Sequence, residues 1–514
     1  MYNLRAAEES SFPGCHDGRT PDRPFPAGAG GRGRAAPWAA AKGLGAIGRA
    51  GHATALARAA EDRDPAVRAA AAHGLGRLGA REAGRDPLVK LMHDQDRDVR
   101  RRALLAAVRL GLDGAAVTEA FARLLGEPDR HLRINALAGL DALGAPGDAS
   151  TLVAALGDAD AAVWGRASSL LYRFRDDPAV RAEVMRTARE GTGAARARVL
   201  EMLPDRCVEG LHAVLLDGLR DPSPQVRVEA ARRLLKAGGG AAVDALATAL
   251  DDESDPEAAG RLLIMLGARG DRRATGPALR WLNHPDAGPR AAFALGGIGT
   301  ETAAERLRTA LDERTLPGPT RAAAARAVGK SGAWDAVWLL LPLLDDADAE
   351  LRAGVVDGLG ALTDGGLRLW ERHPVAWALT AHLAAGGDDV WRTRNALAGL
   401  TQALPAVRRL AGRADSGEVR AAALSLLDAD DPSDGRARGD VRRFVEALND
   451  PHEAVRYHAA LGLTRWTAAG GELPAGSGGE VRDRLARLGA ADPSRRLRQA
   501  ATEALEALGR VTDA

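Results

Sequence analysis

The chain has 514 residues, of which 46% are hydrophobic and only 4% aromatic, and its formal net charge at pH 7 is +1. Its two cysteines, Cys15 and Cys207, are too few and too far apart for a disulfide framework, a metal cluster or a redox motif. No apolar stretch approaches the roughly 18 residues that a membrane-spanning helix needs, and none has the form of a signal peptide. These features predict a cytoplasmic protein that makes no use of a membrane.

Three parts of the chain differ in composition and regularity. Residues 1–35 are rich in Pro, Gly, Arg and Ser and lack apolar periodicity, so we expect a disordered tail that folding does not require. Residues 36–364 read as a regular array of repeats, and residues 365–514 as a less regular continuation with longer loops. The added material lies at 363–374, at 428–440 and at 470–479, each rich in turn-forming residues.

One repeat organises the array. The stretch DRDPAVRAAAAHGLGRLG at 62–79 returns in degraded form about every thirty residues until the chain ends. Arg68 marks its anchor position, and an acidic residue lies six positions before most anchors. The other anchor positions are Arg100, Arg133, Trp164, Arg196, Arg227, Ala259, Gly288, Arg321, Arg352, Arg392, Arg420, Arg456 and Arg498.

Each element of the repeat suits a helix end or a helix face. An Asp before the helix accepts bonds from its first backbone N–H groups, and Pro fits the first turn. Small and apolar residues 3, 4, 7 and 10 positions after the anchor form one buried stripe, and Gly at position 11 can end the helix. A second apolar-periodic segment precedes each anchor helix. These segments lie at 53–60, 117–125, 211–219, 243–250, 303–311, 334–344 and 441–448.

Each repeat is therefore predicted to be a helix pair that buries its apolar faces only by stacking on its neighbours. The predicted fold is all-α, an α-solenoid of about 14 helix pairs. The pattern D-x-D-P-x-V-R-x-x-A-A-x-x-L-G-x-L-G resembles the HEAT-like repeat of the phycobilisome-lyase type over residues 36–512. The resemblance implies a right-handed superhelix with the anchor-bearing second helices on its concave side, and it implies no single activity.

The same resemblance implies a ladder of acidic and Arg side chains between adjacent repeats. Its expected members are Asp62, Arg68, Asp94, Arg100, Glu127, Arg133, Asp221, Arg227, Asp346, Arg352, Asp450, Arg456, Asp492 and Arg498.

No enzyme motif is found in the sequence: there is no Walker loop, G-x-S-x-G, H-E-x-x-H or dinucleotide fingerprint. Some HEAT-like hydroxylases hold two irons through several His-Glu pairs, but this chain has the single pair His452-Glu453, which we interpret as the start of a helix. We expect no catalytic residue, no metal and no cofactor. A bilin-lyase-like role follows only from the repeat resemblance, and Cys207 is interpreted as a small packed residue.

The exposed face of the second helices, at positions 2, 5, 6 and 9 after each anchor, carries fifteen basic and five acidic residues. Apart from Arg394 and Arg465, the basic residues fall between 70 and 330, where we predict a positive groove that binds a partner. Arg stems that merely cover apolar surface would explain the arginines but not the scarcity of acids. The predicted groove residues are Arg77, Arg102, Arg109, Arg166, Arg173, Arg198, Arg232, Arg233, Lys236, Arg261, Arg290, Arg326 and Lys330.

Five of the nine tryptophans lie in one stretch, and they support two interpretations, either core packing between unequal repeats or anchors for a partner. They are Trp334, Trp338, Trp370, Trp377 and Trp391.

The sequence favours a non-catalytic scaffold that grips an acidic segment of a partner protein. The alternative from another class is a nucleic-acid binder, of the kind found among HEAT-like DNA glycosylases. Trp164 with Asp160 would be its candidate pocket pair. The oligomeric state is left open.

Overall fold

The computed structural model describes residues 41, 43, 51–144, 147–203, 210–427 and 435–512. The tail expected at 1–35 lies outside these residues. The chain divides into two compact units, Met1–Glu183 (unit 1) and Val184–Ala514 (unit 2). Within the described residues every regular element is a helix and no strand occurs. None of the helices in this part of the chain is long and apolar enough to cross a membrane.

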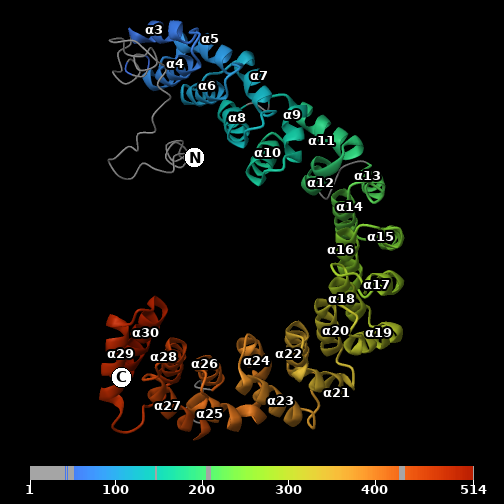
Figure 1. The fold of residues 1–514 in the computed structure, drawn as a ribbon, viewed down its shortest axis with the longest axis vertical. Coiled ribbons are helices and arrows are strands. Elements are labelled where there is room, and N and C mark those ends of the chain that lie inside the picture. Colours follow the sequence, from blue (N-terminus) through green and yellow to red (C-terminus); the bar gives the residue numbers. More distant parts are fainter. Residues whose placement is uncertain are drawn as a thin grey trace, which may run out of the picture. The chain divides into compact units, whose positions relative to one another are not determined.

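Unit 1 alternates first helices with the anchor-bearing second helices (Figure 1). Its first helices are α3 (His52–Ala59), α5 (Arg81–Leu91), α7 (Ala115–Leu124) and α9 (Ala149–Ala154), the last continuing as the 3-10 turn η1 (Ala155–Gly157). Its second helices are α4 (Pro65–Leu78), α6 (Arg97–Arg109), α8 (Arg130–Leu143) and α10 (Ala161–Arg173). Helix α11 (Pro178–Glu190) contains the junction with unit 2.

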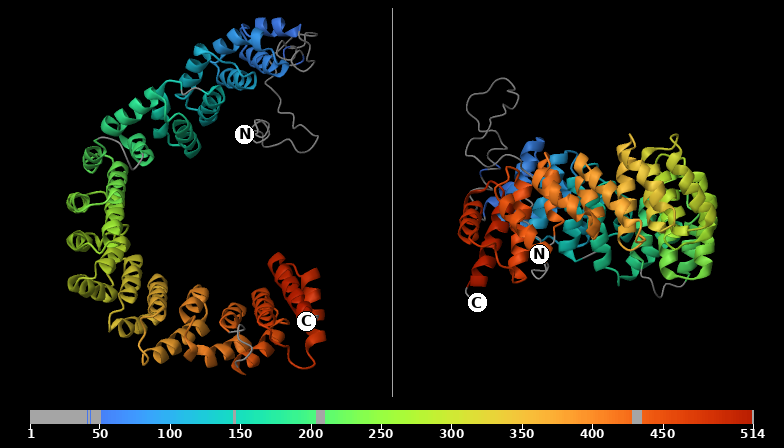
Figure 2. Two further views of the ribbon diagram at one scale, coloured as in Figure 1. Left: turned by 180° about the vertical axis from the view of Figure 1, so that it is seen from behind. Right: turned by 90° about the horizontal axis from the view of Figure 1, so that it is seen from below.

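Unit 2 continues the alternation, with its second helices in one layer and its first helices in another (Figures 1 and 2). The second helices are α12 (Gly193–Met202), α14 (Pro224–Ala237), α16 (Pro256–Gly267), α18 (Gly288–Ile298), α20 (Gly318–Ser331), α22 (Ala349–Thr363), α24 (Val390–Leu397), α26 (Gly417–Ser425), α28 (Glu453–Ala468) and α30 (Arg495–Thr512). The first helices are α13 (Leu211–Gly218), α15 (Gly240–Asp251), α17 (Thr275–Trp281), α19 (Glu301–Asp312), α21 (Ala336–Leu340), α23 (Arg372–Ala385), α25 (Leu404–Arg413), α27 (Gly435–Ala447) and α29 (Gly478–Ala491). The 3-10 turns η2 (Arg272–Ala274), η3 (Leu341–Asp345) and η4 (Thr401–Ala403) link some of them.

The ends of the second helices follow the repeat. The side chain of Asp64 accepts a bond from the Ala66 N–H at the start of α4, and Asp96 accepts bonds from the N–H groups at the start of α6. Gly79 closes α4 at φ 68°, a left-handed conformation that residues with a side chain rarely adopt. Sequence therefore determines where these helices begin and end.

The buried stripe is the core of each repeat. In α4, Ala71, Ala72 and Leu75 are fully buried, while Leu78 at the end of the stripe is half-buried. Second helices pack on the second helices of the neighbouring repeats, and each first helix packs on the second helix of its own repeat. This nearest-neighbour packing is the solenoid architecture that the periodicity predicts.

Glycines allow the closest helix approaches of unit 2, from α16 to α22. A Cβ built on Gly297 would overlap the backbone of Gly267, and one on Gly329 would overlap the backbone of Gly358. A Cβ on Gly354 would likewise overlap Ala322. Backbones that meet this closely leave no room for any larger side chain.

Two expected segments differ from the structure. The first helix predicted at 334–344 is broken: Trp334 precedes α21, which has five residues and is followed by the 3-10 turn η3, where Pro342 cannot donate a helical hydrogen bond. The prediction of a loop at 428–440 is wrong for residues 435–440, because α27 begins at Gly435. Asp440 in this helix is buried and accepts a hydrogen bond from Arg408. The rest of that loop lies outside the described residues.

Candidate partner-binding surface

A buried ladder joins neighbouring repeats within each unit. The Nε and Nη2 atoms of Arg68 donate to the two carboxylate oxygens of Asp94 at 2.7 and 2.9 Å, and its Nη1 donates to the Asp62 carbonyl oxygen at 2.8 Å. Other anchor arginines also pair with the acid of the following repeat. The pairs are Arg100 with Glu127, Arg133 with Asp158, Arg196 with Asp221, Arg227 with Glu253, Arg321 with Asp346, Arg420 with Asp450 and Arg456 with Asp492.

Most rungs tie one guanidinium to a carboxylate of the following repeat and to the turn that begins its own helix. Arg196 and Arg321 donate instead to carbonyl oxygens of the preceding helix, those of Ala188 and Leu311. Burial works to raise the pKa of Asp94, but the bonds from Arg68 and from the Asp96 N–H, with the charge of Arg100, hold it below its ordinary value. Charge-assisted bonds of this bidentate kind are among the stronger polar contacts in proteins. The ladder is a structural device and leaves these arginines occupied.

The ladder changes where the anchor or its acid is replaced. Ala259 and Gly288 stand at anchor positions and have no side-chain donor for an ion pair. The helices of these repeats, α16, α18 and α20, instead pack closely through glycine residues. Among the described residues, Arg352 donates to the carbonyl oxygens of Asp346 and Ala347 and to no carboxylate, and Arg392 pairs with Asp357 of the preceding repeat. Close backbone packing takes the place of the ion pair from α16 to α20.

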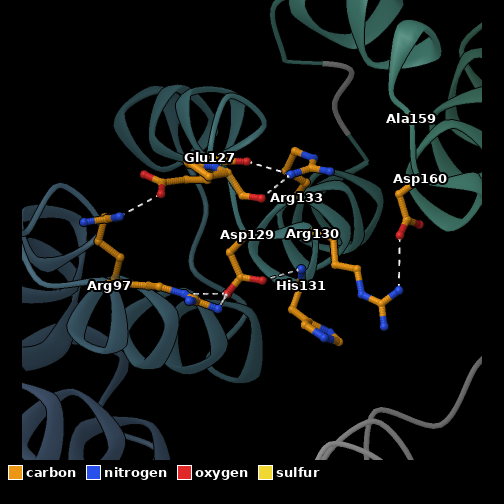
Figure 3. A pocket seen from close by; sticks show the side chains of 10 residues that line it. Arg97, Glu127, Asp129, Arg130, His131, Arg133, Ala159 and Asp160 are labelled. Atoms are coloured by element: carbon orange, nitrogen blue, oxygen red, sulfur yellow. Dashed lines mark hydrogen bonds and ion pairs between the residues drawn. The ribbon is translucent and has the colours of Figure 1, made fainter.

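A second, exposed set of ion pairs lines a cleft of about 660 Å³ in unit 1 (Figure 3). Arg97, the first residue of α6, donates to Asp129, the residue that caps α8, and Arg130 donates to Asp160, which caps α10. His131 also borders the cleft. Sequence reasoning missed this set, although an Arg directly after the capping Asp was its visible signal.

The cleft is compensated in charge. Burial tends to raise the pKa of Asp129, yet the backbone bond from His131 and the ion pair with Arg97 keep it below its ordinary value. The pKa of Asp160 is also lowered, chiefly by the hydrogen bond that its carboxylate accepts from the Ala162 N–H. Asp160 therefore acts as a helix cap with an Arg neighbour, and this gives no support to a nucleotide pocket with Trp164.

One predicted groove residue is not available to a partner. Arg233 is buried and donates to the carbonyl oxygens of Leu203 and Glu201, so its assignment to the exposed face was wrong. The reason is that the helix register turns it into the junction between α14 and α12.

Other predicted groove residues are exposed or half-buried and are paired with carboxylates, so the expectation of little opposing charge fails for them. Arg173 pairs with Asp141, Arg232 with Glu229, Arg326 with Asp357, and Arg261 and Arg290 share Glu257. Asp141 and Glu257 stand at helix positions outside the face that was counted in the sequence. The groove between 70 and 330 is consequently less positive than its arginine content suggests.

The remaining basic residues concentrate on unit 1. Arg77, Arg102 and Arg109 are exposed on α4 and α6, and Arg166 is half-buried on α10. In the described part of the chain no ion pair involves Arg77, Arg102 or Arg166. We name Arg77, Arg102, Arg109 and Arg166 the unit 1 basic surface.

Three more predicted groove residues lie in unit 2. Lys236 is exposed at the end of α14, and Arg198 is half-buried on α12. Lys330 on α20 places its Nζ atom 5.9 Å from the ring centre of Phe293.

The five tryptophans do not fill the core. Trp334, Trp338, Trp370 and Trp377 are 51–77% exposed and Trp391 is 39% exposed, so the packing interpretation was wrong. Their role as anchors stays a prediction.

The other candidates have structural explanations. His452 precedes α28 and is half-buried, while Glu453 is exposed. Among the described residues, no group of three or more His, Cys, Asp or Glu side chains could hold a metal ion. Cys207 lies outside the described residues.

Comparison with known proteins bears on the fold. Residues 34–109 and 85–171 match the family model of HEAT repeats. The crystal structure of importin beta is similar with a TM-score of 0.54 at 13% identity, over 93% of this chain and 80% of that chain. Kap121p is similar with a TM-score of 0.48 at 14% identity, over 89% of this chain and 53% of that chain. No curated protein is significantly similar in sequence. The fold is thus an all-α HEAT-repeat solenoid, and at this identity the likeness extends to the fold alone.

Proposed function

We propose that the protein is a non-catalytic scaffold that binds an acidic segment of a partner protein on the unit 1 basic surface. The observation that carries the proposal is the contrast within unit 1 between ladder arginines, which are matched by carboxylates, and Arg77, Arg102 and Arg166, which have no ion pair in the described chain. Unmatched guanidinium groups on one layer of helices attract an anionic chain and speed its encounter.

The proposal is limited to unit 1 because that is where the exposed charge is least compensated. An extended acidic segment suits such a layer of helices, since α4, α6 and α10 each offer it at least one guanidinium. Arginine also binds carboxylates in a planar, two-point geometry. The solenoid of importin beta supports the fold on which the proposal depends, while the phycobilisome-lyase-type repeat and a cytoplasmic location stay predictions from sequence.

The test is binding of a fluorescently labelled, Glu-rich twelve-residue peptide, measured by anisotropy across a salt series. We expect the triple variant Arg77→Glu, Arg102→Glu, Arg166→Glu to lower the affinity at least tenfold with an unchanged helical circular dichroism spectrum. The ladder bonds do not involve these residues, so the fold should persist. Full affinity in the triple variant would overturn the assignment.

The matched control makes the same change of charge on first helices of unit 2. Arg409, Arg413 and Arg487 are exposed on α25 and α29, and their reversal to Glu should leave peptide affinity within about twofold. A twelve-base-pair DNA duplex is the competing probe. Tighter and more salt-dependent binding of the duplex than of the peptide, lost in the same triple variant, would favour the nucleic-acid alternative through counterion release.

A further inference from the structure

The first helix α23 of unit 2 is apolar on two opposite faces. One face is buried and includes Leu379 and Leu383. The opposite face carries Trp377, Ala381 and Ala384, which are exposed although all three are apolar. Helices in globular proteins usually place polar residues on the side that faces water, and a helix that is apolar all round is normally covered. The outer face of α23 is therefore suited to contact with another protein surface.

The first helices α19 and α25 of the same unit expose charged residues instead. Glu301 and Glu305 are exposed on α19, and Arg409 is exposed on α25. On α23 the apolar exposure continues to Trp370, just before the helix begins. Trp370 and Trp377 are 66% and 77% exposed, which leaves about 300 Å² of indole surface in water. Apolar surface that gathers on one element marks an interaction site, whereas single exposed apolar residues need no explanation.

The preceding first helix, α21, has the same property. Trp334 and Trp338 are four residues apart in the sequence, and both are exposed. The 3-10 turn η3, which directly follows α21, contacts α23, and the two helices follow one another in the first-helix layer (Figure 1). Apolar exposure is thus shared by two successive first helices.

The two ends of the exposed face of α23 carry opposite charges. Arg372 is the first residue of the helix, and the guanidinium carbon of Arg368 lies 5.5 Å from the ring centre of Trp370 at the same end. Glu371, between the two arginines, is buried and accepts a bond from the Arg368 N–H. Asp388 is exposed just beyond the last turn. The face is therefore positive at its start and negative at its end.

Three of these charges have no carboxylate or guanidinium partner. Among the residues that the structure describes, no ion pair involves Arg368, Arg372 or Asp388. Asp389 differs, because its carboxylate lies 3.5 Å from Nε of Arg392. A cation at the start of a helix and an anion at its end both oppose the helix dipole, so α23 gains nothing from them on its own. A second helix that runs in the opposite direction would match both charges.

We propose that two copies of this chain associate through the outer face of α23, with the two helices antiparallel about a two-fold axis near Ala381. Trp377 lies four residues before this point and Ala384 three residues after it, so the large side chain of one copy lies opposite the small one of its partner. The same axis brings Arg372 of each copy toward Asp388 of the other, because every contact in a two-fold interface occurs twice. A parallel pair would place like charges together.

The proposal is independent of the proposed function, because it concerns a different unit and is read out as molecular mass. The test is sedimentation velocity of the full chain over a dilution series that reaches high micromolar concentration. We expect the wild type to reach twice the 53.6 kDa of one chain. Trp377→Glu should weaken this association at least tenfold. Because Trp377 is exposed, the helical circular dichroism spectrum and the melting temperature should not change.

Two matched controls make similar changes elsewhere in unit 2. Phe293→Glu replaces an aromatic residue that is 42% exposed on the second helix α18, and Arg487→Glu reverses an exposed charge on α29. Both variants should associate as the wild type does. Ala381→Glu is a second change within the face, and it should also weaken association, because the two introduced carboxylates meet at the axis.

A charge exchange tests the antiparallel direction. Arg372→Glu and Asp388→Arg, made in separate chains, each place like charges at both ends of the helix pair and should weaken self-association. An equal mixture of the two variants should associate again, measured with one variant fluorescently labelled. In the mixed pair the new Glu of one chain meets the new Arg of the other, and the unchanged Arg372 meets the unchanged Asp388.

Four outcomes would overturn the proposal. A wild type that stays monomeric at the highest concentration would leave the face of α23 to a different protein. A dimer that persists in both Trp377→Glu and Ala381→Glu would place the contact on another surface. A mixture that associates no better than either charge variant alone would exclude the antiparallel pair. Association that appears only after removal of residues 1–35 would show that the chain's own N-terminal segment covers this face.

Discussion

Individual arginines in this protein differ in function according to the carboxylate that each one meets. Arg227 shows the structural role: its side chain is 16% exposed, and it donates to both oxygens of Glu253 and to the Asp221 carbonyl oxygen. Arg102 has the same chemistry on an exposed face. An Arg in this repeat protein can therefore be interpreted only together with the residue six positions before the next anchor.

The Arg227→Ala variant should lower the free energy of unfolding by roughly 1–3 kcal/mol, because it leaves the buried Glu253 carboxylate with fewer donors. Urea denaturation followed by circular dichroism measures this change. Arg102→Ala, which removes an exposed guanidinium, should stay within about 0.5 kcal/mol of the wild type. Equal losses in the two variants would mean that the ladder contributes no more than helix propensity.

His458 gives stability a dependence on pH. Its pKa falls from 6.5 to about 4 in the folded chain, chiefly through burial and then through Arg394 and Arg465. The unfolded chain therefore binds this proton at higher pH than the folded chain does, so stability decreases as pH falls from about 6.5 toward 4. We expect His458→Gln to lose less stability than the wild type between pH 7 and pH 5, measured by denaturant midpoints. A larger loss in the variant would contradict the sign of this effect.

At the scale of whole helices, the sequence predicted most ends correctly because each end has its own local chemistry. Asp64 and Gly79 mark the bounds of α4, and both signals are visible in the sequence. The segment at 334–344 could not be placed in the same way, because its apolar period is helical and only Pro342 indicates the change to a 3-10 turn. Periodicity reports which face is buried, and it is less informative about where the backbone leaves the α-helix.

The candidate site was less predictable than the helices. The excess of basic residues on one face was visible, but Asp141 and Glu257, which neutralise part of it, approach from neighbouring helices. The contact between Trp391 and His458 joins two repeats across a third and has no local signature in the sequence. Pairings between repeats depend on packing, which a single helix pattern does not contain.

The close packing of α20 and α22 through glycine leads to a further prediction about stability. A Cβ on Gly329 would overlap the backbone of Gly358, so Gly329→Ala should separate the two helices and cost roughly 1–3 kcal/mol. Gly412, in α25 of the same unit, has open space around its position, and Gly412→Ala should be neutral or stabilise by up to about 1 kcal/mol. Thermal unfolding of the two variants distinguishes them. A stable Gly329→Ala protein would show that the helices can separate at no cost.

For the whole molecule, the architecture determines how far a local change spreads. Within each unit, second helices contact the second helices of neighbouring repeats, and each first helix contacts the second helix of its own repeat. The stability of a repeat is therefore approximately the sum of its own term and those of the interfaces with its neighbours. The ladder adds to these neighbour terms and never links repeats that are distant in sequence. Damage to one rung should therefore remain within a few repeats.

Hydrogen exchange tests this in both units. Arg133→Ala breaks the bond to Asp158, and Arg420→Ala breaks the bond to Asp450. The first change should raise amide exchange in α8 to α10 and leave α18 to α22 unaltered. The second should raise exchange in α26 to α28 and leave α4 and α6 unaltered, because opening free energies in a solenoid are set locally. A uniform rise along the chain in either variant would instead identify one cooperative body, in which the rungs stabilise all repeats together.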